Sequence, residues 1–208
     1  MFDDRKDAGE RLAVALKRYK DKHILVLAIP RGGVEVGYHV AKYLNADFSI
    51  IISRKLPFPT DPEAGFGAVA EDGSTFILSD ATRWVSQEEI DEIIEKQKQE
   101  ITRRIAVLRR NKPLPDIKDR MVILIDDGIA MGSTMRASIM LCKNKEAKKI
   151  VVATPVTGRD TAREIEEMVD EFVVLEKPLF FYAVAQVYKN WYDVPDREVI
   201  EIMEQWQE

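Results

Sequence analysis

The sequence has 208 residues, a length that fits one medium-sized domain with a substantial core. Its net charge of −5 at pH 7 provides no overall field that attracts nucleic acid, and the single Cys142 excludes an intrachain disulfide. No apolar run is long enough to span a membrane, and the first ten residues are charged rather than signal-like, so we expect a cytoplasmic protein.

The first predicted elements are a helix and a buried strand. Asp3 or Asp4 could cap a helix that runs to about Tyr19, because apolar residues recur there at helical spacing. The apolar run 23–29 then reads as a buried strand. His23 stands at its edge, where we expect no metal-binding or catalytic role.

A glycine turn follows this strand directly. It contains Arg31, Gly32 and Gly33, and it leads into a helical pattern over 34–44. Glycines let the backbone approach an anion closely, and an arginine can hydrogen-bond phosphate oxygens. The turn is therefore a candidate anion site, although an ordinary strand–helix connection would look the same.

A second apolar run, 48–53, predicts another strand, which Arg54 and Lys55 close. Basic residues at the carboxyl end of a strand lie on the ligand-binding edge of an open α/β sheet, but a solvated strand end is the alternative.

The stretch 56–67 contains three prolines and two glycines, so we expect no regular structure there. Asp-Gly at 72–73 predicts a hairpin turn. A long loop with a hairpin is typical of an active-site lid, with a static insertion as the alternative.

A long helix is predicted next. Ser86 and Glu89 form a capping box, and the helix runs to about Arg110 with one apolar stripe. The stripe could pack on the sheet or pair with a second subunit. The helix end carries a basic cluster of Arg103, Arg104, Arg109, Arg110 and Lys112. The cluster has no interleaved aromatic residues, so we interpret it as a solvated face rather than an RNA site.

The most informative stretch is 122–134, VILIDDGIAMGST. A short apolar run reads as a strand buried on both faces, and Asp126 and Asp127 come where it should end. A loop bounded by glycines follows, and Ser133 and Thr134 stand where hydroxyl residues cap a helix. The N–H groups of such a loop can bind phosphate, and the carboxylates can accept hydrogen bonds from sugar hydroxyls. The stretch therefore predicts a phosphosugar site; mutual repulsion of adjacent carboxylates disfavours the alternative of an ordinary turn.

This stretch resembles the ribose-5-phosphate loop of the type I phosphoribosyltransferases, which use phosphoribosyl pyrophosphate (PRPP). Their motif is an apolar strand, two acids and a short loop that ends in Gly and Ser or Thr. The chain departs from it at Met131, where the family often has Thr, and at Ala130, where several hypoxanthine-type members have a further acid. The second departure removes one candidate general base. A base could come from Asp61, Glu63 or Asp72 in the expected lid, or the substrate needs none.

The resemblance implies roles for the other loops as well. In the family a loop after the first core strand binds pyrophosphate, and Arg31–Gly33 resembles it. An Arg-Lys pair after the second strand faces pyrophosphate in adenine- and orotate-type relatives. A flexible loop at the place of the expected lid closes over PRPP, and family members often form homodimers.

The last third of the chain predicts two more strands and three helices. They are strands at 149–154 and 172–175 and helices at 160–169, 183–191 and 196–205. An aromatic run, Phe180, Phe181 and Tyr182, follows the last strand. We interpret these aromatics as core residues, although their position also fits stacking on a flat ring.

Alternating strands and helices predict an α/β fold with a doubly wound, mostly parallel five-stranded sheet and helices on both faces. In the strand order 2-1-3-4-5, the first and third strands are neighbours at the topological switch point. Their two anion loops would lie side by side, which suits a ligand with two phosphate groups on one sugar. We expect one domain over 1–208, with a lid at about 56–80 and a small hood from 1–20 and 176–208.

The hypothesis that follows is phosphoribosyl transfer from PRPP to a nitrogenous acceptor such as a purine or pyrimidine base, with release of pyrophosphate. The expected catalytic residues are Asp126, Asp127, Arg31 and Lys55. The expected PRPP contacts are Arg31, Gly32, Gly33, Arg54, Lys55, Asp126, Asp127, Gly128, Ile129, Ala130, Met131, Gly132, Ser133 and Thr134. The candidate acceptor contacts are Phe180, Phe181 and Tyr182. Mg²⁺ would be held at Asp126 and Asp127, directly or through PRPP hydroxyls.

Two other functions fit less well. A non-catalytic PRPP sensor is the first, since some family members bind RNA or DNA, but the acidic net charge counts against it. A methyltransferase or phosphohydrolase is the second, but the sequence has no Walker-type motif and no GxGxxG after the first strand. The acceptor base cannot be read; Ala130 argues only against a hypoxanthine–guanine pattern.

Overall fold

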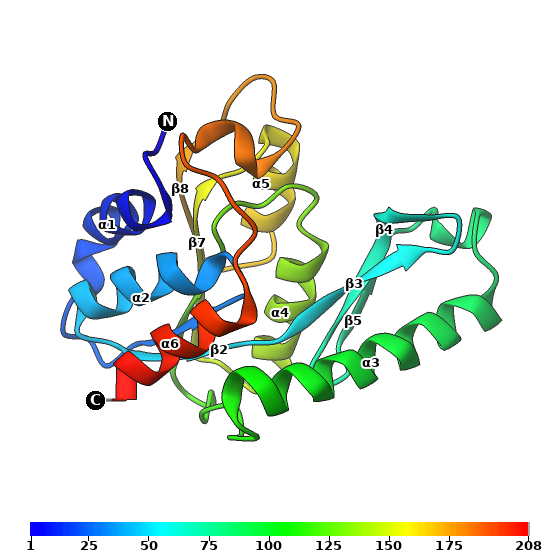
Figure 1. The fold of residues 1–208 in the computed structure, drawn as a ribbon, viewed down its shortest axis with the longest axis horizontal. Coiled ribbons are helices and arrows are strands. Elements are labelled where there is room, and N and C mark those ends of the chain that lie inside the picture. Colours follow the sequence, from blue (N-terminus) through cyan, green and yellow to red (C-terminus); the bar gives the residue numbers. More distant parts are fainter. Residues whose placement is uncertain (208) are drawn as a thin grey trace.

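The main body of the protein is a five-stranded parallel sheet with helices on both faces (Figure 1). The computed structural model describes residues 1–207, without the side chains of Glu63, Thr82 and Gln207. The strands lie in the order β2 (Asp47–Ile50), β1 (Leu25–Ala28), β6 (Met121–Ile125), β7 (Lys149–Val156) and β8 (Glu171–Glu176). The predicted fold class and the order 2-1-3-4-5 are confirmed.

Successive residues of the central strands face opposite helix layers. Val26 and Ala28 of β1 pack in the cluster with α1 (Arg5–Ala15) and α2 (Gly33–Leu44). Leu25 and Leu27 pack in the cluster with α4 (Ser133–Asn144) and α5 (Arg159–Glu166). All four side chains are fully buried. Burial on both faces explains why this strand is a continuous apolar run rather than an alternating one.

A three-stranded antiparallel sheet and the long helix α3 (Gln87–Arg109) form an arm that projects from the main body (Figure 1). Its strands are β3 (Ser53–Phe58), β4 (Asp61–Ala70) and β5 (Thr75–Ile77). The hairpin turn at 72–73 and the Ser86–Glu89 capping box are confirmed. The apolar stripe of α3 packs against the arm and against α6 (Asp196–Gln207). Within the described residues no helix has the length and apolar character needed to cross a bilayer.

The prediction that 56–67 lacks regular structure is wrong, because β3 and β4 pair across it. Pro57 is tolerated because β3 is an outer strand and the pairing register shifts on either side of this residue. Arg54 and Lys55 also lie in β3. They therefore begin the arm instead of closing the second core strand, which ends at Ile50.

Residues 183–191 do not form the expected helix. Only a short 3₁₀ turn, η3 (Val184–Val187), is present, and Tyr188 is extended and forms a parallel bridge with Phe2. The N–H of Phe2 donates to the carbonyl of Val187 over 2.7 Å, and the N–H of Lys189 donates to the carbonyl of Phe2 over 2.9 Å. Pairing with a distant segment thus overrides the local helical pattern.

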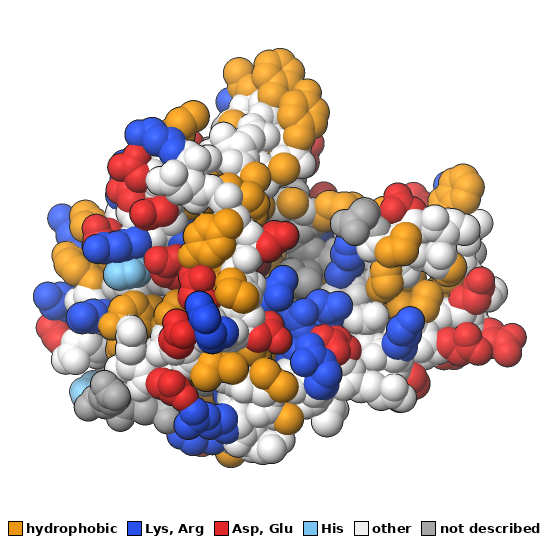
Figure 2. Space-filling model, in the orientation of Figure 1, with side chains coloured by type: hydrophobic (Ala, Val, Ile, Leu, Met, Phe, Trp, Pro, Cys, Tyr) orange, Lys and Arg blue, Asp and Glu red, His pale blue; other side chains and the backbone are white. Residues whose placement is uncertain are grey.

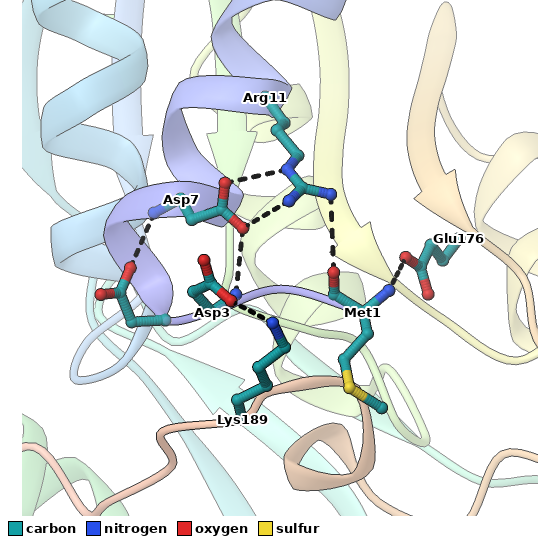
Figure 3. A network of polar contacts seen from close by, with 7 residues as sticks. Met1, Asp3, Asp7, Arg11, Glu176 and Lys189 are labelled. Atoms are coloured by element: carbon teal, nitrogen blue, oxygen red, sulfur yellow. Dashed lines mark hydrogen bonds and ion pairs between the residues drawn. The ribbon is translucent and has the colours of Figure 1, made fainter.

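Exposed ion pairs also join the start of the chain to the end of β8 and to the segment after it (Figure 3). Lys189 pairs with Asp3 over 2.6 Å, and the amino group of Met1 pairs with Glu176. On α1, Arg11 holds Asp7 at 2.8 Å. The first turn of α1 thus lies beside the carboxyl end of β8.

Arg109, at the end of α3, is not part of a solvated face as the sequence suggested. Its side chain is 4% exposed and donates to both carboxylate oxygens of Glu71, over 2.9 and 2.5 Å, and to the carbonyl of Ile50 over 3.0 Å. Glu71 also accepts from the N–H of Ile52 over 2.9 Å. This buried ion pair joins α3 and β4 to the segment between the two sheets.

Cys142 is fully enclosed on α4. Burial raises the pKa of its thiol to about 12. We expect the native protein to resist iodoacetamide at pH 8, because almost no thiolate forms and the sulfur is not accessible. Mass spectrometry should find alkylation after denaturation in urea; rapid alkylation of the native protein would contradict the burial.

Candidate functional site

A cavity of about 320 Å³ opens at the carboxyl end of β6. Asp126, the loop 128–132 and the first residues of α4 form one side of it. Lys55 and Gly65 contribute from the arm, and Val184 contributes from the segment after β8. Three parts of the molecule therefore meet around the motif that the sequence singled out.

The carbonyl groups of the loop point into the protein. Ile129 accepts from the hydroxyl of Thr157 over 2.8 Å, and Ala130 accepts from that of Thr161 over 2.9 Å. Met131 accepts from the guanidinium of Arg136 over 2.7 Å. In a planar trans peptide the N–H points opposite to the C=O. The next three N–H groups, at 130 to 132, are therefore directed away from these side chains, and all three residues line the cavity.

The N-terminus of α4 continues this set of donors. Its N-cap is Gly132, at φ 77°, which has no side chain to accept a hydrogen bond from the first turn. The expectation that Ser133 and Thr134 cap the helix is wrong, because they are its first two residues. The first N–H groups of a helix have no partner within it, and the helix dipole makes this end positive. The loop and helix end together suit a phosphate group.

The two acids differ in their surroundings. Asp126 lines the cavity, and its carboxylate accepts from the N–H of Asp127 over 2.9 Å. Asp127 is 8% exposed, and its Oδ2 accepts from Nε of Arg5 over 2.8 Å. Burial and the charge of Asp127 raise the pKa of Asp126 well above its usual range. Burial also raises the pKa of Asp127, but Arg5 opposes that rise.

The glycine turn 31–33 packs directly on these acids. A Cβ added to Gly32 would lie 1.8 Å from Oδ2 of Asp127, and one added to Gly33 would lie 2.9 Å from Cα of Asp126. The two predicted anion loops are therefore brought side by side, as the strand order suggested.

Replacement of Gly32 by Ala should displace the Asp127 carboxylate, because a carbon atom cannot lie 1.8 Å from an oxygen. Under the hypothesis that PRPP binds at this site, we expect its affinity to fall about tenfold or more, the scale of one lost charge-assisted hydrogen bond. Isothermal titration calorimetry would measure this. Gly158→Ala is a matched control, since its new methyl group would meet only Phe181 at 3.5 Å. Equal affinities for both variants would contradict the prediction.

Of the other predicted basic residues, Lys55 lines the cavity from the arm, whereas Arg31 and Arg54 do not line it. Arg31 faces Asp196 at 3.6 Å, and Arg54 donates to Gln97 over 3.2 Å. Burial, with the charges of Arg104 and Arg31, lowers the pKa of Arg54. The stem of Lys55 packs over Gly65. In Figure 2 basic side chains gather between the main body and the arm.

The prediction of core packing for the aromatic run after β8 holds for Phe181, which is partly buried against a core cluster, but is wrong for Phe180 and Tyr182. Phe180 and Tyr182 are 72% and 85% exposed, and Figure 2 shows hydrophobic side chains on the protruding loop at the top. Phe181 packs beside Gly158. None of the three lines the cavity, whose contact from this segment is Val184.

The candidate general bases whose side chains are described, Asp61 and Asp72, do not line the cavity. Both carboxylate oxygens of Asp72 accept hydrogen bonds from Ser74, at a turn beside the far end of α4. Asp72 is therefore remote from the cavity. Asp61 is exposed at the start of β4 and does not line the cavity. The side chain of Glu63 lies outside the described residues.

A family model described as the phosphoribosyl transferase domain matches residues 2–189. The chain belongs to this family. Two Mycobacterium tuberculosis proteins, MT0597 and Rv0571c, carry provisional phosphoribosyl transferase names and are each 36% identical over 206 residues. The match covers 98% of this chain but 46% of each relative, so the chain spans about half the length of these curated proteins.

Two solved structures share the fold of this chain. The crystal structure of TT1426 from Thermus thermophilus matches with a TM-score of 0.83 and 33% identity, over 99% of this chain and 98% of that one. AQ2163 from Aquifex aeolicus matches with a TM-score of 0.52 and 13% identity, over 82% of this chain and 73% of that one. The second likeness shows a shared fold alone.

The sequence analysis did not identify several residues that contact the phosphoribosyl transferase motif. They are Arg5, Arg136, Thr157, Thr161, Val184 and Tyr188. The three that hold the loop carbonyls lie on elements that the strand order places next to the loop, but nothing in their spacing marks them. Arg5 lies within the family match, yet its position on an amphipathic helix gave no signal of a buried charge.

Proposed function

We propose that the chain transfers the phosphoribosyl group of PRPP to a nitrogenous acceptor, a nucleobase, and releases pyrophosphate. The observation that carries the proposal is the packing of the 31–33 turn on the acids that precede the 128–134 loop. The 128–134 loop and Asp126 line the cavity, and the 31–33 turn packs behind these acids. Two candidate anion-binding turns beside a carboxylate would suit a sugar with phosphate groups at two positions. Family membership supports the same reaction.

In this mechanism the 5-phosphate binds the N–H groups at 130 to 134. Asp126 accepts hydrogen bonds from the ribose hydroxyls and stabilises positive charge that develops on the sugar, since loss of the leaving group passes through an oxocarbenium-like state. Arg31, Arg54 and Lys55 stabilise the departing pyrophosphate. The arm residues at about 56–80 serve as the lid; the contribution of Lys55 and Gly65 to the cavity wall supports this role.

Magnesium fits the site as an ion held largely by the substrate. Among the described residues no group of three or more His, Cys, Asp or Glu side chains is arranged to hold a metal. Asp126 faces the cavity, whereas Oδ2 of Asp127 is taken by Arg5. Mg²⁺ commonly binds through one or two carboxylates together with substrate phosphates. When bound, it would neutralise charge on the pyrophosphate.

The test is a panel of purine and pyrimidine bases with PRPP and Mg²⁺, followed by pyrophosphate release. Release with one base would support the proposal and identify the acceptor. Tight PRPP binding without consumption would favour a sensor. Calorimetry with PRPP–Mg²⁺, ATP and S-adenosylmethionine completes the test, and a preference for either of the last two would overturn the proposal. The homodimer stays a prediction that light scattering can check.

A further inference from the structure

Arg5 is a buried charge at the site, although it lies more than a hundred residues before the motif. Its side chain is 3% exposed. Nε donates to Oδ2 of Asp127 over 2.8 Å, and a terminal nitrogen donates to the carbonyl of Tyr192 over 3.0 Å. The guanidinium also lies 4.1 Å from the ring centroid of Trp191. Contacts on three sides fix its orientation.

Asp127 is fixed in turn at two points. Its carboxylate is held by Arg5, and its carbonyl accepts from the hydroxyl of Tyr188 over 2.6 Å. Gly32 leaves room for this contact, since a Cβ there would lie 3.0 Å from Nε of Arg5 and still closer to Asp127. The contact therefore lies directly behind both anion-binding turns.

As a consequence, the two adjacent acids face different surroundings. Asp126 borders the cavity, whereas Asp127 does not and is turned to Arg5. Without a cation at this place, Asp127 would be a buried, unpaired carboxylate next to a second one. It would then be driven to reorient toward the cavity or toward solvent, and the neighbouring Asp126 would lose its defined direction.

We propose that Arg5 is a positioning residue that fixes Asp127 and thereby keeps Asp126 as the carboxylate directed at the bound sugar. The inference rests on the proposed reaction with PRPP. It assigns to the first turn of α1, and to the aromatic segment behind it, a part in the site that the sequence pattern does not reveal. Arg5 itself touches neither the cavity nor the reacting atoms.

The test is a double-mutant cycle on PRPP–Mg²⁺ affinity and on kcat/KM with the acceptor found in the base panel. The variants are Arg5→Gln, Asp127→Asn and the two combined. We expect Arg5→Gln to weaken PRPP binding about tenfold, and to cause no further loss once Asp127 is Asn, because Arg5 acts through that carboxylate. Arg5→Lys should recover part of the affinity, since it keeps the charge. Arg11→Gln, on the same helix but exposed, should change neither quantity.

The outcomes separate this inference from the proposed function. A wild-type protein that does not bind PRPP overturns both. A wild-type protein that binds PRPP, with a folded Arg5→Gln variant of equal affinity, overturns only the role of Arg5. Full additivity in the cycle would also overturn it, because a general loss of stability does not depend on Asp127. If Arg5→Gln does not fold, the same cycle is run with Arg5→Lys, and additivity there has the same meaning.

Discussion

The Asp126→Asn variant is expected to lose pyrophosphate release by about 10²–10³-fold, the scale on which one preorganised electrostatic contact contributes to turnover. Asn has nearly the same shape, so the cavity wall should be preserved. Pyrophosphate release under saturating PRPP, with the acceptor identified in the base panel, is the measurement. Asp160→Asn is the control, because that side chain is 92% exposed on α5. Unchanged turnover in Asp126→Asn would remove this carboxylate from the proposed mechanism.

The same variant should be more stable than the wild type at pH 7. The pKa of Asp126 is raised in the folded state. Between the pKa of this group in the unfolded chain and its raised folded-state pKa, the folded protein therefore binds more protons than the unfolded chain. The free energy of unfolding falls as the pH rises through that interval. Asn cannot ionise and avoids this loss. Thermal unfolding at pH 4 and pH 7 should therefore show a larger advantage for Asp126→Asn at the higher pH. A smaller advantage at pH 7 than at pH 4 would contradict the raised pKa.

Replacement of Glu71 by Ala is expected to lower the free energy of unfolding by about 3–5 kcal/mol, because it leaves the buried Arg109 without its partner. For a protein of this size that corresponds to a fall in Tm of about 6–20 °C. Glu71 also accepts from the N–H of Ile52, which would lose its hydrogen bond. Calorimetry or circular dichroism with heating would measure the change.

Two comparisons show whether the loss arises from the ion pair. Glu146→Ala removes one side of an exposed pair with Lys118 and should change Tm very little. The combined replacement Glu71→Leu and Arg109→Met should be less damaging than Glu71→Ala alone, since no unpaired charge remains buried. If the double variant is the less stable of the two, the hydrogen bonds of Arg109 to the carbonyls of Ile50 and Lys112 are the dominant contribution.

The main sheet could be predicted from the sequence because its strands are buried on both faces and therefore stand out as apolar runs. The apolar run that opens the stretch 122–134 lies within β6 (Met121–Ile125). The strand order then placed the two glycine turns together, and the structure agrees. Such features depend on local composition and on the strong handedness of parallel connections, both of which are visible without coordinates.

The arm could not be predicted in the same way. Prolines and glycines at 56–67 ordinarily exclude strands, but an outer strand with shifted register accepts Pro57, and Gly65 makes room for Lys55. The core position predicted for the aromatic run was wrong for two of its three residues. Hydrophobic residues are more often inside than outside, yet Phe180 and Tyr182 are exposed. Neither the strand edge nor the protruding loop has a local sequence signal.

The polar contacts behind the motif are the least predictable part of the site. The contact of Arg5 with Asp127 joins residues 122 positions apart, and Tyr188 and Tyr192 complete it from the segment after β8. Helical periodicity identifies which face of α1 is buried but not which buried residue is charged. Only the tertiary arrangement brings these groups together.

The bridge between Phe2 and Tyr188 has a consequence for synthesis on the ribosome. Helix α1 leaves the exit tunnel before the sheet, and the sheet with its acid pair can form as translation proceeds. The residues that hold Arg5 from behind, Trp191 and Tyr192, emerge only after all five strands of that sheet. A nascent chain therefore has the 128–134 loop before Asp127 is fixed, and under the proposed function the site would be complete only once this later segment has been made.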